Sequence, residues 1–334
     1  MNSVINILIY DNISIVYYYM YLEIASKLCS EALLSLYPVF VKNINIPLHL
    51  QLWSRFITYI VITGFFVNWD FIYNSLLSKN GLLLSFVTII HVYTSYRGFQ
   101  LLESGVAYAL FYTYPLMILL LAGEPINLLM ILAIIGVLLL SNDIPGSLIE
   151  TDNDNGNVNE NGNKKETYMD QSDTPSILHE HMMNNTKNNK YIPDSILDIF
   201  TKNEGYIMIA FAALTEAIIY FIVRSIKTTN NWNHMFLSYF LGTFLFSFIG
   251  IKDIVKITFS STLSISLVIN AIIGLCGYVL RFYATTRLSP SIYAPLSYVG
   301  IVMAYIYGFI FNNDKINLQK IIGTLCILLA IVQV

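Results

Sequence analysis

Long apolar stretches, each close to the length of one membrane crossing, follow one another along the chain. A helix needs about 20 mostly apolar residues to cross the hydrocarbon core of a bilayer. By that measure the sequence predicts ten spanning helices, at residues 22–41, 50–68, 81–101, 104–122, 126–141, 205–225, 234–251, 263–286, 290–311 and 316–333. Several junctions, such as residues 123–125 and 288–290, are very short, so the helices that they join must run antiparallel.

One segment, residues 142–204, breaks this pattern. It is rich in Asn, Asp and Gly, poor in branched apolar residues, and carries 12 of the 21 acidic residues. A segment of this composition buries too little apolar surface to offset its ordering entropy, so we expect a disordered loop between the fifth and sixth helices. The chain has a net charge of −3 only because the 12 acidic residues of this loop outnumber its 5 lysines, and the chain gives no sign of a nucleic-acid partner.

The overall composition agrees with a membrane protein. With 56% hydrophobic and 12% charged residues, the chain cannot cover a water-soluble globule with polar surface, so we predict an integral multi-pass membrane protein. Basic residues divide evenly between the two sides of the predicted bundle, so their distribution does not indicate its orientation in the membrane. The choice between a plasma membrane and an endomembrane stays open as well. Residues 1–21 lack the cationic start of a signal peptide and are interpreted as a lead-in to the first helix.

Without the loop, two blocks remain, residues 22–141 and 205–334, and their landmarks recur in the same order. The shared landmarks are the triplets SEA at 30–32 and TEA at 215–217, the tyrosines Tyr112 and Tyr298, and the motifs EPINL at 124–128 and DKINL at 314–318. Offsets of 185, 186 and 190 residues separate them, a drift that small insertions explain. The two blocks are therefore interpreted as repeats of one five-helix unit.

The odd number of crossings per repeat determines how the second copy is oriented. Five crossings reverse the side from which the chain enters, so the second repeat must be inverted relative to the first. The predicted fold is an all-α integral membrane protein with ten transmembrane helices as two inverted five-helix repeats. Inverted repeats are typical of secondary transporters, which bind substrate near the membrane midplane where the halves meet.

Two segments carry a family resemblance: YALFYTYPLMILLLAGEPINLLMILAIIGVLLL in the first repeat and YAPLSYVGIVMAYIYGFIFNNDKINLQKIIGTLCILLA in the second. In each, a helix runs into an acidic residue and a short turn before a last helix with small residues. The pattern resembles the EamA-type unit of the drug/metabolite transporter (DMT) superfamily and is similar to that of solute-carrier-35-like transporters. The resemblance implies transport of a small molecule through a central cavity built by the first four helices of each repeat.

One departure from that superfamily concerns the substrate. Members that move phosphorylated sugars resemble one another in a Lys-Arg pair in the ninth helix. The equivalent stretch here, residues 298–301, holds no basic residue. This difference argues against a phosphate substrate.

Two acidic residues, Glu31 and Glu216, lie near the middle of equivalent predicted helices. An ionisable group at the centre of a bilayer costs about 2.5–3.5 kcal/mol on insertion scales, so each is a candidate site residue. The pair would bind a cationic group of a substrate, a proton, or both in exchange. A structural interpretation stays open, because Lys27 lies one turn before Glu31 and would neutralise it, while Glu216 would pack against Tyr220.

Three uncharged or weakly basic side chains are further candidates for the substrate or proton site. Tyr112 and Tyr298 lie well inside equivalent helices, where they would offer hydroxyls and ring faces to a polar or cationic substrate. His91 lies deep in the third predicted helix. A hydrogen-bonded packing role is the alternative for this histidine.

Arginines near helix ends are harder to assign. Arg97 and Arg281 are each interpreted either as a cation of the binding site or as an anchor whose long side chain reaches the headgroups. Arg55, close to the start of the second predicted helix, is interpreted as an interfacial anchor.

No catalytic motif accompanies these residues. The sequence holds no phosphate-binding loop, no nucleophile elbow and no Cys or His cluster with metal spacing outside the loop, so we expect neither an enzyme nor a metal or cofactor. The predicted partners are a small-molecule substrate and the lipid bilayer, and a homodimer stays open.

The sequence thus predicts a secondary active transporter that moves a small polar metabolite by alternating access, coupled to protons or working by exchange. A cationic or zwitterionic substrate is slightly preferred, because the deepest charges are acidic. Two alternatives remain. One is a nucleotide-sugar or other organic-anion exchanger of the same superfamily, and the other is a non-transporting membrane scaffold or sensor with the same fold.

Overall fold

The computed structural model of the chain describes residues 20–37, 40–41, 44, 46–102, 104–125, 128–141, 203–254, 261–312 and 318–332. They belong to one of the two units into which the chain divides, Met1–Asn142 with Asn203–Val334, and the other unit is Asp143–Lys202. The predicted lead-in and the predicted disordered loop fall almost wholly outside the described residues. Within those residues every regular element is a helix, as predicted for an all-α protein.

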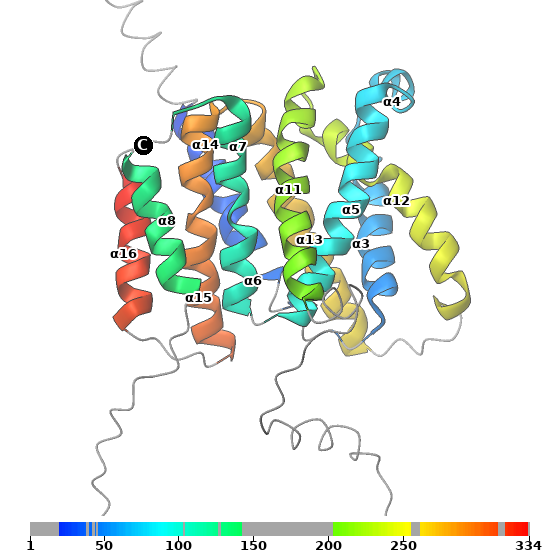
Figure 1. Cartoon of the computed structure of the whole chain (residues 1–334). Coiled ribbons are helices and arrows are strands. Elements are labelled where there is room, and N and C mark those ends of the chain that lie inside the picture. The colour runs from blue at the N-terminus through cyan, green and yellow to red at the C-terminus, as the bar shows by residue number, and fades with distance from the viewer. Residues whose placement is uncertain are drawn as a thin grey trace, which may run out of the picture. The chain divides into compact units, whose positions relative to one another are not determined.

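The helices lie close to the predicted positions (Figure 1). In the first half, residues 20–34 are helical and are followed by α3 (Leu48–Thr63), α4 (Trp69–Ser75), α5 (Lys79–Leu101), α6 (Ser104–Phe111), α7 (Tyr114–Ala122) and α8 (Leu128–Ser141). The second half contains α11 (Glu204–Ser225), α12 (Asn231–Ile254), α13 (Ser261–Thr285), α14 (Pro290–Ser297), α15 (Val299–Asn312) and α16 (Leu318–Val332). Two differences stand out: the short α4 was not expected, and the fourth and ninth predicted helices are each divided in two.

Length and composition identify the helices that are able to cross a bilayer. Among the described residues three qualify, Glu204–Ser225, Leu263–Thr285 and Pro290–Phe311, and a fourth is gained if α4 and α5, bent by 87°, count as one span. α3, α8 and α16 have only 16, 14 and 15 residues, fewer than the about 20 that a straight crossing needs. This measure gives fewer spans than the ten predicted, because several of the predicted spans are short or broken helices.

A proline lies close to the break in both the fourth and the ninth predicted helices. α7 begins just before Pro115, and α14 contains Pro295. Proline has no backbone N–H to donate and its ring displaces the preceding turn, so a helix bends or ends beside it. The breaks fall at Tyr112 and Thr113 in the first half and at Tyr298 in the second. They therefore lie at positions that the predicted repeat makes equivalent.

Several helices of the first half pack against helices of the second half, and α3 runs antiparallel to α12. On α3, Arg55 Nη2 donates to Tyr239 OH at 2.8 Å, while the earlier residue Trp53 donates through Nε1 to Ser247 Oγ, later on α12, at 3.1 Å. In the same way α8 packs along α16, α7 against α14 and α6 against α15. Each of these pairs joins one helix from each half of the chain.

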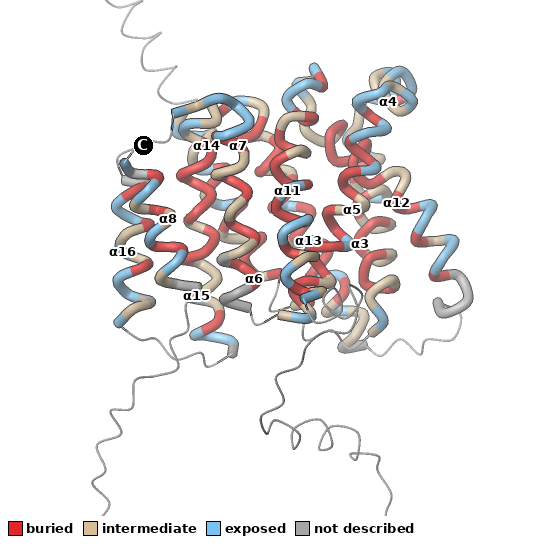
Figure 2. The backbone as a smooth tube through the Cα atoms, viewed as in Figure 1, coloured by how far each residue is buried: buried red, intermediate tan, exposed pale blue. Residues whose placement is uncertain are grey.

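The outer faces of the bundle expose large apolar side chains. Leu128 on α8, Phe248 on α12 and Leu318 on α16 are 78%, 86% and 72% exposed. Along α8 and α16, pale-blue exposed segments alternate with red buried ones (Figure 2). Apolar surface of this extent is unfavourable in water and matches the hydrocarbon of a bilayer, as expected for an integral membrane protein.

The contact between α8 and α16 depends on glycine. A Cβ atom added to Gly136 would lie 2.6 Å from the carbonyl oxygen of Gly323 and 2.8 Å from Ile327 Cγ1. Ala133, one turn before Gly136, is fully buried. The two backbones therefore approach closely, as small residues in membrane helices permit.

Replacing Gly136 with valine should destabilise the protein. The branched side chain would overlap the α16 backbone, and overpacking of this kind costs about 1–3 kcal/mol. We expect a lower melting temperature for Gly136→Val in detergent, measured as loss of monodisperse protein on heating. Ile135→Val, at a position 45% exposed on the same helix, is the control and should melt with the wild type. A wild-type melting temperature for Gly136→Val would contradict this description of the contact.

Candidate functional site

Five charged or titratable side chains from four helices meet in the interior of the bundle. Lys27 and Glu31 come from the helix at residues 20–34, His91 from α5, Glu216 from α11 and Arg281 from α13. Each residue is at most 4% exposed. Buried charges are costly unless they are paired and hydrogen-bonded, so the partners of these groups decide what the cluster does.

Arg281 lies between the two carboxylates. Its Nη2 atom donates to both oxygens of Glu31, at 3.0 Å and 3.1 Å, and its Nη1 atom donates to Glu216 Oε1 at 2.5 Å. Lys27 donates to Glu31 Oε1 from one helical turn away. Two carboxylates thus face two basic groups. The bridge also ties the first half of the chain, through Glu31, to the second half, through Glu216 and Arg281.

Two tyrosines complete the contacts of Glu31. Tyr112 donates to Oε2 at 2.8 Å and Tyr114 donates to Oε1 at 3.2 Å. Residues i and i+2 of a regular helix do not face the same neighbour, so both hydroxyls reach one carboxylate because the helix is broken between α6 and α7. Gly300 on α15 makes room for Tyr112, since a Cβ atom there would collide with the Tyr112 hydroxyl.

Lys27 is held by more than its ion pair. Its Nζ atom lies 3.6 Å from the centre of the Tyr293 ring on α14 and 3.4 Å from the Tyr114 hydroxyl. A desolvated cation over an aromatic face gains about 2 kcal/mol. The pairing of Lys27 with Glu31 that the sequence left open is therefore present, and both oxygens of Glu31 are occupied in this conformation.

His91 connects α5 with α11 and α13. Its Nδ1 atom lies 3.1 Å from the Ala212 carbonyl oxygen, which can only accept, so Nδ1 carries the proton. Its Nε2 atom lies 3.2 Å from the Tyr278 hydroxyl and 3.2 Å from Glu216 Oε2. In the neutral ring Nε2 accepts from Tyr278, and Glu216 Oε2 is left without a donor among the described residues. Glu216 therefore keeps an open acceptor, unlike Glu31.

Two of the predicted site residues lie outside this cluster. Arg97 forms an ion pair with Glu204 at 2.7 Å near the end of α5, where the two side chains are 36% and 34% exposed. Tyr298 is buried in the apolar core, and its hydroxyl makes no hydrogen bond to the described residues. The cluster brings together the other five predicted residues: Glu31, His91, Tyr112, Glu216 and Arg281.

The prediction that Arg55 is an interfacial anchor is wrong, because its guanidinium is buried inside the bundle and is only 3% exposed. Nη1 donates to Tyr96 OH at 3.2 Å and Nη2 to Tyr239 OH at 2.8 Å. Five tyrosine rings surround the guanidinium at 4.7–5.6 Å from their centres: Tyr37, Tyr59, Tyr96, Tyr239 and Tyr278. We call this group the tyrosine cage. The sequence offered one signal for it, Tyr59, one turn after Arg55.

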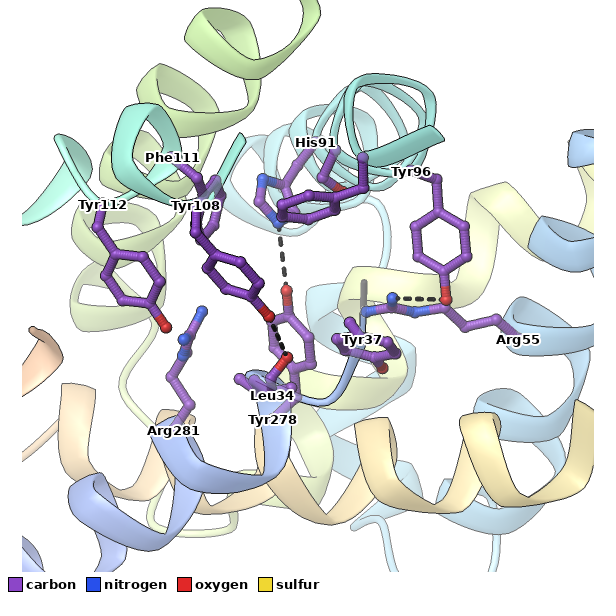
Figure 3. Close-up of a pocket in the computed structure, with 12 residues that line it drawn as sticks. Leu34, Tyr37, Arg55, His91, Tyr96, Tyr108, Phe111, Tyr112, Tyr278 and Arg281 are labelled. Atoms are coloured by element: carbon purple, nitrogen blue, oxygen red, sulfur yellow. Dashed lines mark hydrogen bonds between the residues drawn. The ribbon is translucent and has the colours of Figure 1, made fainter. Parts of the chain in front are cut away.

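A small cavity lies between Arg55 and Arg281 (Figure 3). Its volume is about 30 Å³, enough for about two water molecules. His91 and several tyrosine hydroxyls also line it, and none of its lining residues is acidic. Substrate pockets usually measure about 300–1,000 Å³, so the cavity is closed in this conformation. In the described ranges no group of three or more His, Cys, Asp or Glu is arranged to hold a metal ion.

Comparison with known proteins confirms the predicted family. A model of the EamA-like transporter family matches residues 203–334. No curated protein matches the chain. A solved structure described only as the crystal structure of a protein has a TM-score of 0.59 at 13% identity, covering 93% of this chain and 95% of the other, which shows a shared fold. Residues 203–334 therefore form a domain of the EamA-like transporter family, which belongs to the drug/metabolite transporter superfamily and whose members move small molecules across membranes.

Proposed function

We propose that the protein is a secondary active transporter that carries a small polar metabolite across its membrane by alternating access. Charged residues from both halves meet inside the bundle beside equivalent helix breaks, and this single observation carries the proposal. Ionisable groups inside membrane bundles mark substrate or ion pathways. Broken helices at matching places in two halves are a feature of transporter binding sites.

The proposal includes ten crossings as two inverted repeats, residues 22–141 and 205–334. It is supported by the packing of counterpart helices, α3 with α12, α7 with α14 and α8 with α16. Two other pairs fit the same symmetry: α5 packs on α11, and the helix at residues 20–34 meets α13 through the Glu31–Arg281 ion pair. A twofold axis in the membrane plane would exchange these two pairs.

The Arg281 bridge suggests how substrate binding would drive the change in access. A substrate with a charged group would replace one partner of the bridge, so that the halves part without leaving a buried charge unpaired. A cationic group would bind at Glu216, whose Oε2 atom is open, and would weaken the pair of Glu216 with Arg281, leaving the Arg281–Glu31 pair as the link between the halves. A proton on Glu216 would have the same effect, so the arrangement suits both proton coupling and exchange.

Neutralising Glu216 should reduce transport. In Glu216→Gln, Arg281 loses one of its two charged partners, and breaking a buried pair costs about 3–5 kcal/mol. We expect uptake of the substrate found in a metabolite-library screen with proteoliposomes to fall by more than about tenfold, which is about 1.4 kcal/mol.

Glu204→Gln is the matched control, because it makes the same change on the same helix at a half-exposed ion pair. Its uptake should stay within about twofold of the wild type, since exposed pairs contribute about 0–1 kcal/mol. Equal uptake by Glu216→Gln and the wild type would rule out a transport role for Glu216. It would favour the non-transporting scaffold instead.

Two tyrosines of equivalent position test the hydrogen bond to Glu31. Tyr112 and Tyr298 are each 1% exposed, but only Tyr112 donates to a carboxylate. A hydrogen bond to a charged group contributes about 1.5–3 kcal/mol, so Tyr112→Phe should lower uptake by about tenfold or more. Tyr298→Phe should leave it unchanged. Equal losses in both variants would show that the Tyr298 hydroxyl acts in another conformation of the cycle.

A further inference from the structure

Arg55 is a buried cation without an acidic partner. No described carboxylate forms an ion pair with it, whereas Arg281 contacts two. The buried ionic residues of the described chain are Lys27, Glu31, Arg55, Glu216 and Arg281. With His91 neutral, the interior therefore holds three positive and two negative charges. The excess charge lies at Arg55, because Lys27 and Arg281 are paired.

The tyrosine cage stabilises this cation only in part. Tyr96 and Tyr239 accept hydrogen bonds from the two terminal nitrogens, and the ring faces attract the charge. Neither contact supplies the negative charge that a desolvated guanidinium requires. The Nε atom of Arg55 is also buried without a hydrogen-bond partner.

The cavity between Arg55 and Arg281 is the place where a compensating anion would lie once the cavity opens beyond its present volume of about 30 Å³. Both guanidinium groups line it, and no acidic residue does. In Figure 3, Arg55 and Tyr96 lie on one side of the cavity, and Arg281 and Tyr112 on the other. An anion in this space would meet guanidinium N–H groups and the hydroxyl of Tyr96, which accepts from Arg55 and keeps its own proton to donate.

We propose that Arg55 forms the anion subsite for the transported molecule and receives a carboxylate or similar singly charged group. A planar guanidinium fits a carboxylate through two parallel hydrogen bonds, and one negative charge balances the one excess positive charge. The proposal rests on the transport function and specifies its substrate class. A purely cationic metabolite would add to the excess charge, whereas a zwitterion would satisfy both Arg55 and the open oxygen of Glu216.

Binding of small carboxylates to the purified full-length protein tests this subsite. We expect sodium acetate and sodium benzoate to raise the melting temperature saturably relative to sodium chloride at equal ionic strength, and methylammonium chloride not to do so. In Arg55→Gln the apparent Kd of the carboxylates should be at least about tenfold weaker. Arg97→Gln, the same change at a half-exposed ion pair, should keep the wild-type Kd. If Arg55→Gln does not fold, Arg55→Lys replaces it and should also bind about tenfold more weakly, because it keeps the charge and loses the planar fork.

The outcomes separate the two proposals. The subsite is overturned if neither carboxylate stabilises the wild type beyond chloride, or if the Arg55 variant binds as tightly as the wild type. If carboxylate binding depends on Arg55 but proteoliposomes that contain the protein take up no metabolite, the proposed transport function is overturned and the anion subsite is not. Uptake that is indifferent to loss of the Arg55 guanidinium would overturn the subsite alone.

Discussion

Arg281 spans the distance between Glu31 and Glu216, and the positions of the surrounding helices are tied to that bridge. The three side chains come from three helices and meet at one point. Each buried charge would be strongly unfavourable without its partners in a bundle that excludes water, so the three helices must pack together. The break between α6 and α7 then allows two hydroxyls to reach Glu31. The interior is therefore organised by charge compensation as much as by apolar packing.

The two equivalent acids differ in how completely they are satisfied. Glu31 accepts from Lys27, Arg281 and two tyrosines, so it has nothing left to offer a ligand in this conformation. Glu216 has one firm partner and one open oxygen. Positions that the predicted repeat makes equivalent thus have different chemistry, which would suit the proposed binding of an asymmetric molecule in one orientation.

The family, most helix positions and the central acids could be predicted from the sequence, because the length of an apolar stretch and the recurrence of short motifs are visible in the sequence itself. Lys27 was visible as a partner of Glu31 for the same reason, since the two residues lie one helical turn apart. Contacts between distant residues were not visible. Arg55 was misjudged because the predicted helix began at residue 50 and ended at 68, whereas α3 is Leu48–Thr63, so the residue lies at its middle and not at its start. Tyr114 could not be assigned either, since its reach to Glu31 depends on where the helix breaks.

The unpaired charge in the tyrosine cage has an electrical consequence. A site with one excess positive charge responds to the membrane potential when it is empty, and moving a full elementary charge through 100 mV changes the free energy by about 2.3 kcal/mol. On the proposed transport function, a bound monoanion would cancel that charge, so that the loaded site would move through the field as a neutral unit, whereas a bound zwitterion would leave the net charge unchanged. For an anionic cargo the voltage would then act on the return of the empty carrier and not on the movement of its cargo.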